Sequence, residues 1–185
     1  MIINIILERK EMTKYRLSKL SGVPQTTVID ICNGKTKLYN CKSGILYKLS
    51  KTLNVTMELL LEERPDFEIY KSYICHKVKN LGDLDFIIQI LEENEIRNLY
   101  NKYWYPECLY LLAMVDYLCR VNDIPLCENY NDLRNMRLKE ILFPTGVHAR
   151  CVVSDSELPK YESVNAAIPE FIRHNIVEAE VRNVC

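Results

Sequence analysis

A break at Ser21-Gly22-Val23, with a short helical segment on either side, is the feature that most constrains how this chain folds. The spacing of apolar residues predicts one helix over residues 14–20 and another over residues 25–33. Thr13 can cap the first helix because its hydroxyl accepts a hydrogen bond from an unpaired amide of the first turn, and Pro24 suits the start of the second. Gly22 can take the positive φ that a sharp turn requires. The sequence therefore predicts two short helices joined by a tight turn.

Similar signals for the starts and ends of helices lie on both sides of this pair. An apolar stripe predicts a helix over residues 2–11, before the pair. Two further helices are expected after it, one over residues 43–53 and one that Thr56 caps. The polar, proline-containing stretch at residues 62–66 then indicates a boundary. Residues 1–63 are therefore expected to form a five-helix domain.

Residues 64–185 are expected to form a second, mostly helical domain, which makes the fold class mainly α. Residues 107–121, behind Pro106, are apolar almost all the way round, which is typical of a central, buried helix. The C-terminal residues 176–184 fit either an alternating strand or a helix. The other expected helices cover residues 67–79, residues 84–103 with a bend or a helix break near residues 92–95, and residues 132–142, which end before Pro144.

Composition excludes several classes of protein. With 48% hydrophobic and 26% charged residues, the chain has the balance of a soluble globular protein. The apolar run at residues 2–7 is too short for a secretory signal. The run at residues 109–115 stops at Asp116, well short of the roughly eighteen apolar residues that a membrane span needs. We therefore expect a cytoplasmic protein without a membrane partner.

Eight cysteines are scattered along the chain without a C-x-x-C pair. Because zinc ligands usually come in closely spaced pairs, this spacing argues against a zinc site, and we expect neither a metal nor a cofactor. Without an export signal, the cysteines are expected to be reduced thiols that pack as small apolar side chains. The eight are Cys32, Cys41, Cys75, Cys108, Cys119, Cys127, Cys151 and Cys185.

The net charge of −1 hides a strong asymmetry. Residues 1–64 carry eleven Lys/Arg against six Asp/Glu, a net charge of +5, whereas the remainder carries thirteen against nineteen, a net charge of −6. A basic N-terminal region joined to an acidic body fits a part that binds a polyanion and a part with another task.

Residues 13–37, T-K-Y-R-L-S-K-L-S-G-V-P-Q-T-T-V-I-D-I-C-N-G-K-T-K, resemble the helix-turn-helix of the lambda-repressor/Cro-like (Xre) family, and residues 44–60 resemble that family's fourth and fifth helices. The resemblance covers about a third of the chain. It implies that residues 1–63 bind double-stranded DNA and that the second helix of the pair enters the major groove. It also implies a bacterial transcription regulator.

The resemblance assigns roles to individual side chains of that second helix. Gln25, Thr26 and Asp30 occupy the exposed positions that meet base edges in this family, and Thr27 lies near enough for a base or a phosphate. Their chemistry is suitable, because glutamine can pair with adenine, threonine can touch a thymine methyl, and aspartate can accept from the amino group of cytosine. The alternative is a helix surface that is only soluble.

Lysines follow the same helix in the sequence. The resemblance implies that Lys35, Lys37 and Lys42 run along the DNA phosphates, joined by Lys14. Such contacts set register and affinity without reading the sequence. An ordinary solvated lysine loop is the alternative.

The body carries two features with open interpretations. Asp116 precedes Arg120 by one helical turn, which favours a salt link over a catalytic acid. Aromatic residues are dense around this helix and fit either a ligand pocket or interface, or core packing. They are Tyr100, Tyr103, Trp104, Tyr105, Tyr110 and Tyr117.

An enzyme is not expected. The candidate nucleophiles and bases are Cys75 beside His76, His148 near Cys151, and His174. No phosphate loop, nucleotide fingerprint or metal motif accompanies them, and proximity in sequence does not make a catalytic pair.

Three functions fit these observations. The first is a dimeric transcription regulator, most simply a repressor, whose body dimerises or senses a small-molecule effector. The second is an antitoxin that represses its own operon and neutralises a protein toxin through the acidic body. In the third, the body is an interaction or inhibitor module and DNA binding is secondary. A neighbouring gene for a small toxin would favour the second.

Overall fold

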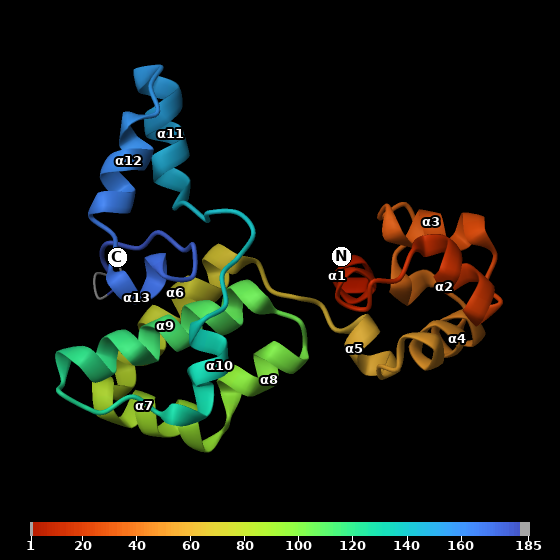
Figure 1. Cartoon of the computed structure of the whole chain (residues 1–185), viewed down its shortest axis with the longest axis horizontal. Coiled ribbons are helices and arrows are strands. Elements are labelled where there is room, and N and C mark those ends of the chain that lie inside the picture. The colour runs from red at the N-terminus through yellow and green to blue at the C-terminus, as the bar shows by residue number, and fades with distance from the viewer. Residues whose placement is uncertain (1, 182–185) are drawn as a thin grey trace. The chain divides into compact units, whose positions relative to one another are not determined.

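The computed structural model describes residues 2–181, which divide into two compact units between Arg64 and Pro65. Unit 1 contains helices α1 to α5, and unit 2 contains α6 to α13 (Figure 1). Apart from one isolated bridge between Leu142 and Ile176, the regular elements of the described residues are helices. The expected mainly α fold class is confirmed.

Unit 1 contains the five short helices that the sequence predicts. They are α1 (Ile2–Arg9), α2 (Lys14–Ser21), α3 (Gln25–Cys32), α4 (Ser43–Leu53) and α5 (Met57–Leu61), with a 3₁₀ turn at Leu38–Asn40. The first helix was expected to reach residue 11 but ends at Arg9, because Glu11 has a left-handed φ of 48°. The predicted cap of α5 is confirmed, since the Thr56 hydroxyl accepts from the Leu59 amide at 3.1 Å.

The core of unit 1 holds α2 and α3 against the other helices. Leu17, Val28, Ile31, Leu49 and Leu53 are fully buried. Helix α2 packs on both α3 and α4. At the end of α3, the side-chain amide of Asn4 in α1 donates to the Cys32 carbonyl at 2.9 Å. The position of α3 is therefore fixed by packing and by a tertiary hydrogen bond.

Unit 2 is built around α9 (Tyr105–Val121), which packs against α6 (Phe67–Leu81), α7 (Asp83–Glu92), α8 (Glu95–Asn101), α10 (Asn131–Arg134) and α13 (Pro169–Ile172). Its central, buried position confirms the expectation from its apolar sequence. The predicted break near residues 92–95 is also confirmed, because Asn94 has a left-handed φ of 51° between α7 and α8. The remaining helices are α11 (Thr145–Ser154) and α12 (Leu158–Asn165).

The helix predicted over residues 132–142 is wrong. Helix α10 ends at Arg134, and the next residues run in an irregular path beside residues 174–177. The amide of Leu138 donates to His174 O at 3.1 Å, and that of Leu142 donates to Asn175 O at 2.8 Å. Hydrogen bonds to a distant segment therefore replace the local helical ones.

The C-terminal segment, for which strand and helix were both open, adopts neither as a continuous element in its described part. Ile176 forms the isolated bridge, and the amide of Val177 donates to Leu142 O at 2.9 Å. Val184 and Cys185 lie outside the described residues.

The predicted salt link between Asp116 and Arg120 is also wrong. Asp116 is 1% exposed, and its two oxygens accept from Nη2 and Nε of Arg134, both at 2.8 Å, and from Nη2 of Arg173 at 2.7 Å. Arg120, whose side chain is half exposed, instead donates to Glu170 at 2.6 and 3.1 Å. The hydrogen bonds to Asp116 raise the pKa of the Arg134 guanidinium. The buried carboxylate of Asp116 is thus paired with two arginines, Arg134 and Arg173, that lie outside α9.

All seven described cysteines are free thiols. Cys32, Cys108 and Cys119 are buried, and burial raises the pKa of each, in the case of Cys108 to about 12. None of the helices in residues 2–181 combines the length and apolar character needed to cross a bilayer.

Residues 1–63 are expected to fold without the rest of the chain, because unit 1 has its own buried core. A domain of this size is near the lower limit for independent folding, so a cooperative but modest thermal transition is expected. Well-dispersed amide resonances from the isolated fragment would agree with this expectation. Poorly dispersed amide resonances, as a disordered chain gives, would contradict this expectation.

Replacing Asp116 by alanine should destabilise unit 2 by about 3–5 kcal/mol, because two arginines lose their buried carboxylate. Arg120→Ala is the matched control, and it should cost at most about 1 kcal/mol because water screens its half-exposed pair. Urea denaturation of the full chain would measure both. Equal losses of unfolding free energy in the two variants would show that the buried Asp116 cluster stabilises the unit no more than the exposed Arg120 pair does.

Candidate nucleic-acid interface

The path of the turn between α2 and α3 is fixed by a left-handed glycine, and α2 itself begins at a side-chain N-cap. The Thr13 hydroxyl accepts from the Arg16 amide at 3.1 Å at the start of α2, which confirms the predicted N-cap. Gly22 ends α2 with a left-handed φ of 64°, and its amide donates to Ser18 O. Because L-residues with a Cβ are strained at this φ, glycine is the residue that allows the chain to reverse here.

Two serines brace the same turn. The hydroxyl of Ser18 donates to Val23 O at 2.7 Å, and that of Ser21 donates to Leu17 O at 2.7 Å. The Ser21 oxygen also accepts from the Val23 amide at 3.2 Å. The sequence interpretation assigned no role to these serines, although serines in the last turn of a helix are a signal for such local bonds. Together the bonds fix the direction in which α3 leaves α2.

Helix α3 has one buried and one outward face. Val28 and Ile31 are fully buried, and Cys32 is nearly so. Gln25 and Thr26 are exposed at the start of the helix, while Thr27 and Asp30 are half-buried beside them. The structure therefore brings the four predicted base-reading residues together on the first two turns of one short helix.

The N-terminus of α3 is left open by its own side chains. Pro24 occupies the cap position and makes no side-chain hydrogen bond, so the helix begins directly at Gln25. Amides of the first turn point away from the helix and have no intrahelical acceptor. They can donate to a phosphate oxygen, which the partial positive charge of a helix N-terminus favours.

The predicted phosphate-binding lysines are solvent-exposed. Lys35 and Lys37 lie in the segment between α3 and the 3₁₀ turn, and Lys42 directly precedes α4. Lys14 differs from them, because its ammonium donates to Asn33 Oδ1 at 3.1 Å and so links the start of α2 to the end of α3. All four lysines are thus surface groups, and Lys14 is oriented by a hydrogen bond to a neighbour.

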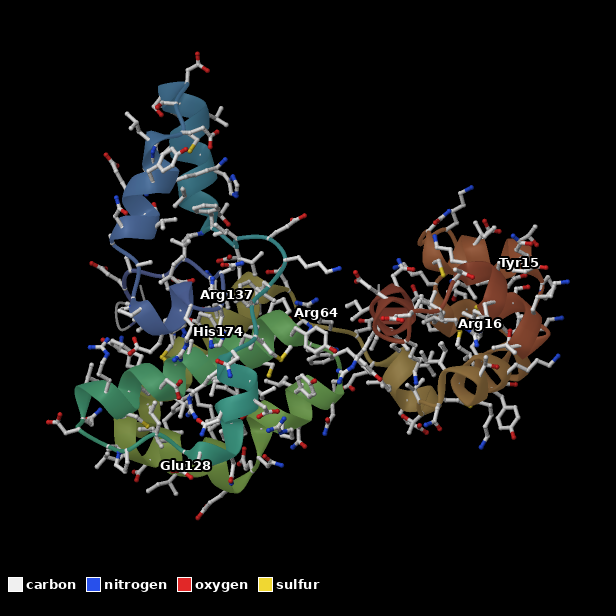
Figure 2. All side chains as sticks on the ribbon, in the orientation of Figure 1. Tyr15, Arg16, Arg64, Glu128, Arg137 and His174 are labelled. Atoms are coloured by element: carbon white, nitrogen blue, oxygen red, sulfur yellow. The ribbon has the colours of Figure 1, made fainter. Side chains whose placement is uncertain are left out.

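The sequence interpretation missed several exposed aromatic and basic side chains of unit 1. Tyr15 and Arg16 lie on the exposed surface of α2 (Figure 2). The ammonium of Lys19 lies 5.5 Å from the centre of the Tyr15 ring, and that of Lys37 lies 5.4 Å from the Tyr39 ring. The four-residue spacing of Tyr15 and Lys19 could have indicated the first pair. These pairs hold positive charge next to flat aromatic surface.

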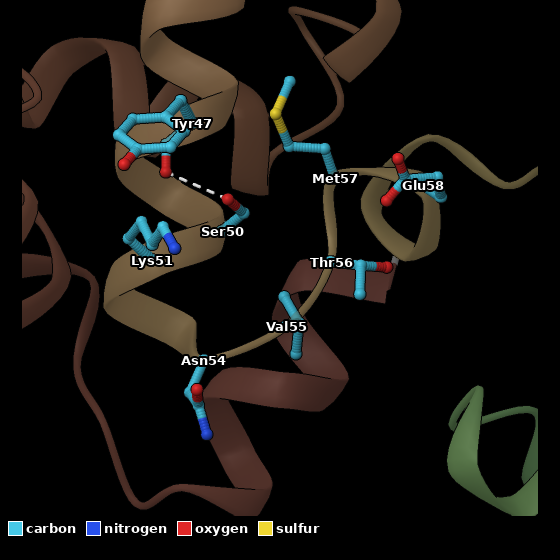
Figure 3. Close-up of a pocket in the computed structure, with 8 residues that line it drawn as sticks. All are labelled: Tyr47, Ser50, Lys51, Asn54, Val55, Thr56, Met57 and Glu58. Atoms are coloured by element: carbon cyan, nitrogen blue, oxygen red, sulfur yellow. Dashed lines mark hydrogen bonds between the residues drawn. The ribbon is translucent and has the colours of Figure 1, made fainter.

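Unit 1 also has a shallow groove of about 420 Å³ at the junction of α4 and α5 (Figure 3). Within it the Ser50 hydroxyl donates to Tyr47 O at 2.9 Å, and none of the lining residues belongs to α2 or α3. The lining residues are Tyr47, Ser50, Lys51, Asn54, Val55, Thr56, Met57 and Glu58. The groove is therefore separate from the predicted base-reading surface.

In unit 2, the aromatic side chains mainly serve packing. Tyr110 is buried, with ring centres of Phe67 and Phe171 at 5.8 and 5.0 Å, and Trp104 is 9% exposed. The other four tyrosines of the cluster are half-buried. Trp104 also lines a groove of about 520 Å³ together with Tyr70, Tyr73 and other residues of α6 and α8, so one end of the cluster is accessible.

The candidate nucleophiles and bases of unit 2 have separate structural partners. Cys75 Sγ lies 3.4 Å from the Tyr110 hydroxyl, and burial raises the pKa of its thiol, whereas His76 Nδ1 lies 2.7 Å from Ser72 O. His174 is buried, its Nδ1 lies 2.7 Å from Met136 O, and burial lowers its pKa (Figure 2). His148 and Cys151 line a shared hollow on α11. Residues 2–181 contain no group of three His, Cys, Asp or Glu side chains arranged to hold a metal ion.

Comparison with known proteins agrees with this geometry for unit 1. Residues 3–66 match the family model of the Cro/C1-type HTH DNA-binding domain. No curated protein and no solved structure matches the chain. The N-terminal third of this protein is a Cro/C1-type, lambda-repressor-like helix-turn-helix domain, which supports a DNA-binding transcription regulator.

Proposed function

We propose that the protein is a sequence-specific transcription repressor that binds double-stranded DNA as a dimer in the bacterial cytoplasm. The observation that carries this proposal is the outward face of α3, where Gln25 and Thr26 are exposed on a helix whose inner face is fixed in the core. A helix presented in this way can enter the major groove without rearrangement.

The chemistry of this face supports base reading. Gln25 can form two hydrogen bonds to an adenine, and Thr26 can bond a base or contact a thymine methyl group. Thr27 reaches either a base or a phosphate. Asp30 accepts from the amino group of cytosine and repels an incorrectly placed phosphate or carbonyl, so it adds discrimination as well as attraction.

The lysines supply the sequence-independent part of the binding energy. Lys35, Lys37 and Lys42 are free to meet phosphates on leaving α3, and Lys14 can meet a phosphate while it stays bonded to Asn33. Each phosphate that is neutralised releases counterions, so this part of the affinity falls as salt rises.

Dimeric repression follows from the size of the reading surface. One short helix reads only a few base pairs, whereas a dimer reads two half-sites about one helical turn apart. A protein bound across a promoter excludes the polymerase sterically, so repression needs no surface beyond those that bind DNA and join the two chains.

Gln25→Ala should lower affinity for the preferred site by about 1–3 kcal/mol and relax the choice of base at one position of each half-site. The preferred site would first be selected from a random DNA pool with the full-length protein. Binding of both proteins to that site and to its single-base variants would then be titrated. An unchanged base preference in the variant would remove Gln25 from the reading surface.

Lys35→Ala should weaken binding to all sequences alike and reduce the slope of log K against log salt by about one for each chain, which is about two for the dimer. The matched control is Lys79→Ala, an exposed lysine of unit 2, which should leave the slope unchanged. Titrations across a salt series would separate the three proteins. A Lys35 variant with the wild-type slope would contradict a phosphate contact at this position.

A further inference from the structure

Helices α11 and α12 form a hairpin that projects from the rest of unit 2 (Figure 1). The two helices pack mainly against each other. Val147 and Pro159 are buried on the inner side of the hairpin, and Nη2 of Arg150 donates to the Ser163 hydroxyl at 3.2 Å across it. The hairpin therefore has a defined register but little support from the remainder of the fold.

The end of this hairpin carries exposed apolar side chains. Val152 and Val153 are 82% and 88% exposed, the highest values among the large apolar side chains of the described residues. On α12, Leu158 and Tyr161 are 64% and 68% exposed, three residues apart and so on one face of the helix. All four lie near the turn that joins the helices. We call this set, Val152, Val153, Leu158 and Tyr161, the tip patch.

Several highly exposed apolar side chains at the end of a small projecting element are typical of an interaction surface. Two helices of ten and eight residues extend only about 15 and 12 Å, and a pair this short cannot bury both of its faces alone. A second pair of helices laid over the outer side would complete a four-helix arrangement.

The charges of the hairpin indicate which partner fits. Arg150 is the one charged residue of α11, whereas the turn and α12 carry the carboxylates of Asp155, Glu157 and Glu162. Lys160, the one cation of α12, is engaged by Glu157 at 2.6 Å. Among the described residues, neither Asp155 nor Glu162 has an ion-pair partner. A surface with a basic half and an acidic half is complementary to a copy of itself turned by 180°.

The register of the hairpin makes this complementarity specific. Arg150 lies four residues before the end of α11, and Glu162 lies four residues after the start of α12. The two are therefore at the same height above the turn, as the bond between Arg150 and Ser163 also requires. If a second hairpin lies face to face with its helices parallel to the first, α11 faces the α12 of the copy. Arg150, which is exposed and retains donors besides its bond to Ser163, then lies opposite the partner's Glu162, and the two tip patches meet.

We propose that the outer face of the α11–α12 hairpin is a homodimer interface, in which two copies pair about a two-fold axis parallel to the helices. The tip patches form its apolar centre, and two symmetric pairs between Arg150 and Glu162 fix its register. This inference rests on the dimer of the proposed function and names the surface that forms it.

The dimensions of the hairpin imply a weak dimer. An interface built on helices this short lies at the small end of specific protein–protein contacts, below about 1,200 Å² in total. Dimers should therefore form in the micromolar range and dissociate on dilution, so the experiment must cover a range of concentrations.

Sedimentation velocity of the full-length protein tests the patch. Wild type should shift from one 21.7 kDa chain toward twice that mass as concentration rises. Val153→Glu should raise the dimer dissociation constant by at least about tenfold, because two carboxylates replace apolar contacts at the centre. Ile88→Glu, at a 52% exposed apolar position on α7, is the matched control and should dimerise as wild type does. Circular dichroism would verify that all three proteins are equally helical.

A charge exchange tests the register. Arg150→Glu and Glu162→Arg should each dimerise poorly, because each homodimer opposes like charges twice. A mixture of the two variants should form a heterodimer, in which both pairs again join opposite charges. This rescue cannot result from a loss of folding, since two damaged chains would not restore one another.

A wild-type chain that stays monomeric at high concentration, a Val153→Glu variant that dimerises normally, or a charge-exchange mixture without rescue would each overturn the interface. These outcomes are distinct from a failure of the proposed function. A protein that reads a specific DNA site while its hairpin variants remain dimeric retains the function and loses the interface. A protein whose hairpin variants become monomers but that selects no DNA site retains the interface and loses the function.

Discussion

The burial of Val28 and Ile31 in unit 1 is the constraint on which the rest of the DNA-binding surface depends. Successive residues of an α-helix are rotated by about 100°, so fixing these two side chains also fixes the direction of every other side chain on α3. Gln25 and Thr26 face outward for this reason. The serine hydroxyl bonds at the turn add a second constraint, because they set the path by which α3 leaves α2.

The opposite net charges of the two units determine which unit approaches DNA more favourably. Unit 1 is attracted to a polyanion, whereas the acidic body is repelled by it, and both effects act over about 8–10 Å at physiological salt. A non-specific encounter with DNA is thus more favourable through unit 1 than through the acidic body. In the proposed mode of binding, the lysines around α3 hold the domain loosely on any sequence, while Gln25 and its neighbours discriminate among sequences.

Local signals in the sequence predicted local structure well. The caps at Thr13 and Thr56, the glycine turn at Gly22 and the break at Asn94 are set by residues within one or two helical turns, and each is where the sequence indicates. The exposed positions of Gln25 and Thr26 follow from the same periodicity, once Val28 and Ile31 are assigned to the core.

Features that depend on distant residues could not be predicted in the same way. The amphipathic pattern of residues 132–142 is real, but hydrogen bonds to residues 174 and 175 outcompete the helix. Asp116 takes Arg134 and Arg173 as partners because it is buried among them, and nothing in its neighbourhood along the chain indicates either one. The exposure of Val152 and Val153 was hidden for a related reason, since an apolar pair in a sequence does not say whether anything covers it.

The proposed weak homodimer contact and the proposed small reading surface are consistent with each other. When two heads occupy half-sites on one DNA molecule, the hairpins that join them meet at an effective concentration far above that of the free protein. A contact with micromolar strength in solution is then sufficient to join two heads that are already bound. With a small reading surface on each head, we expect a single head to bind weakly and occupancy of the full site to rise steeply with protein concentration. A tight dimer formed before DNA binding would lose that steepness.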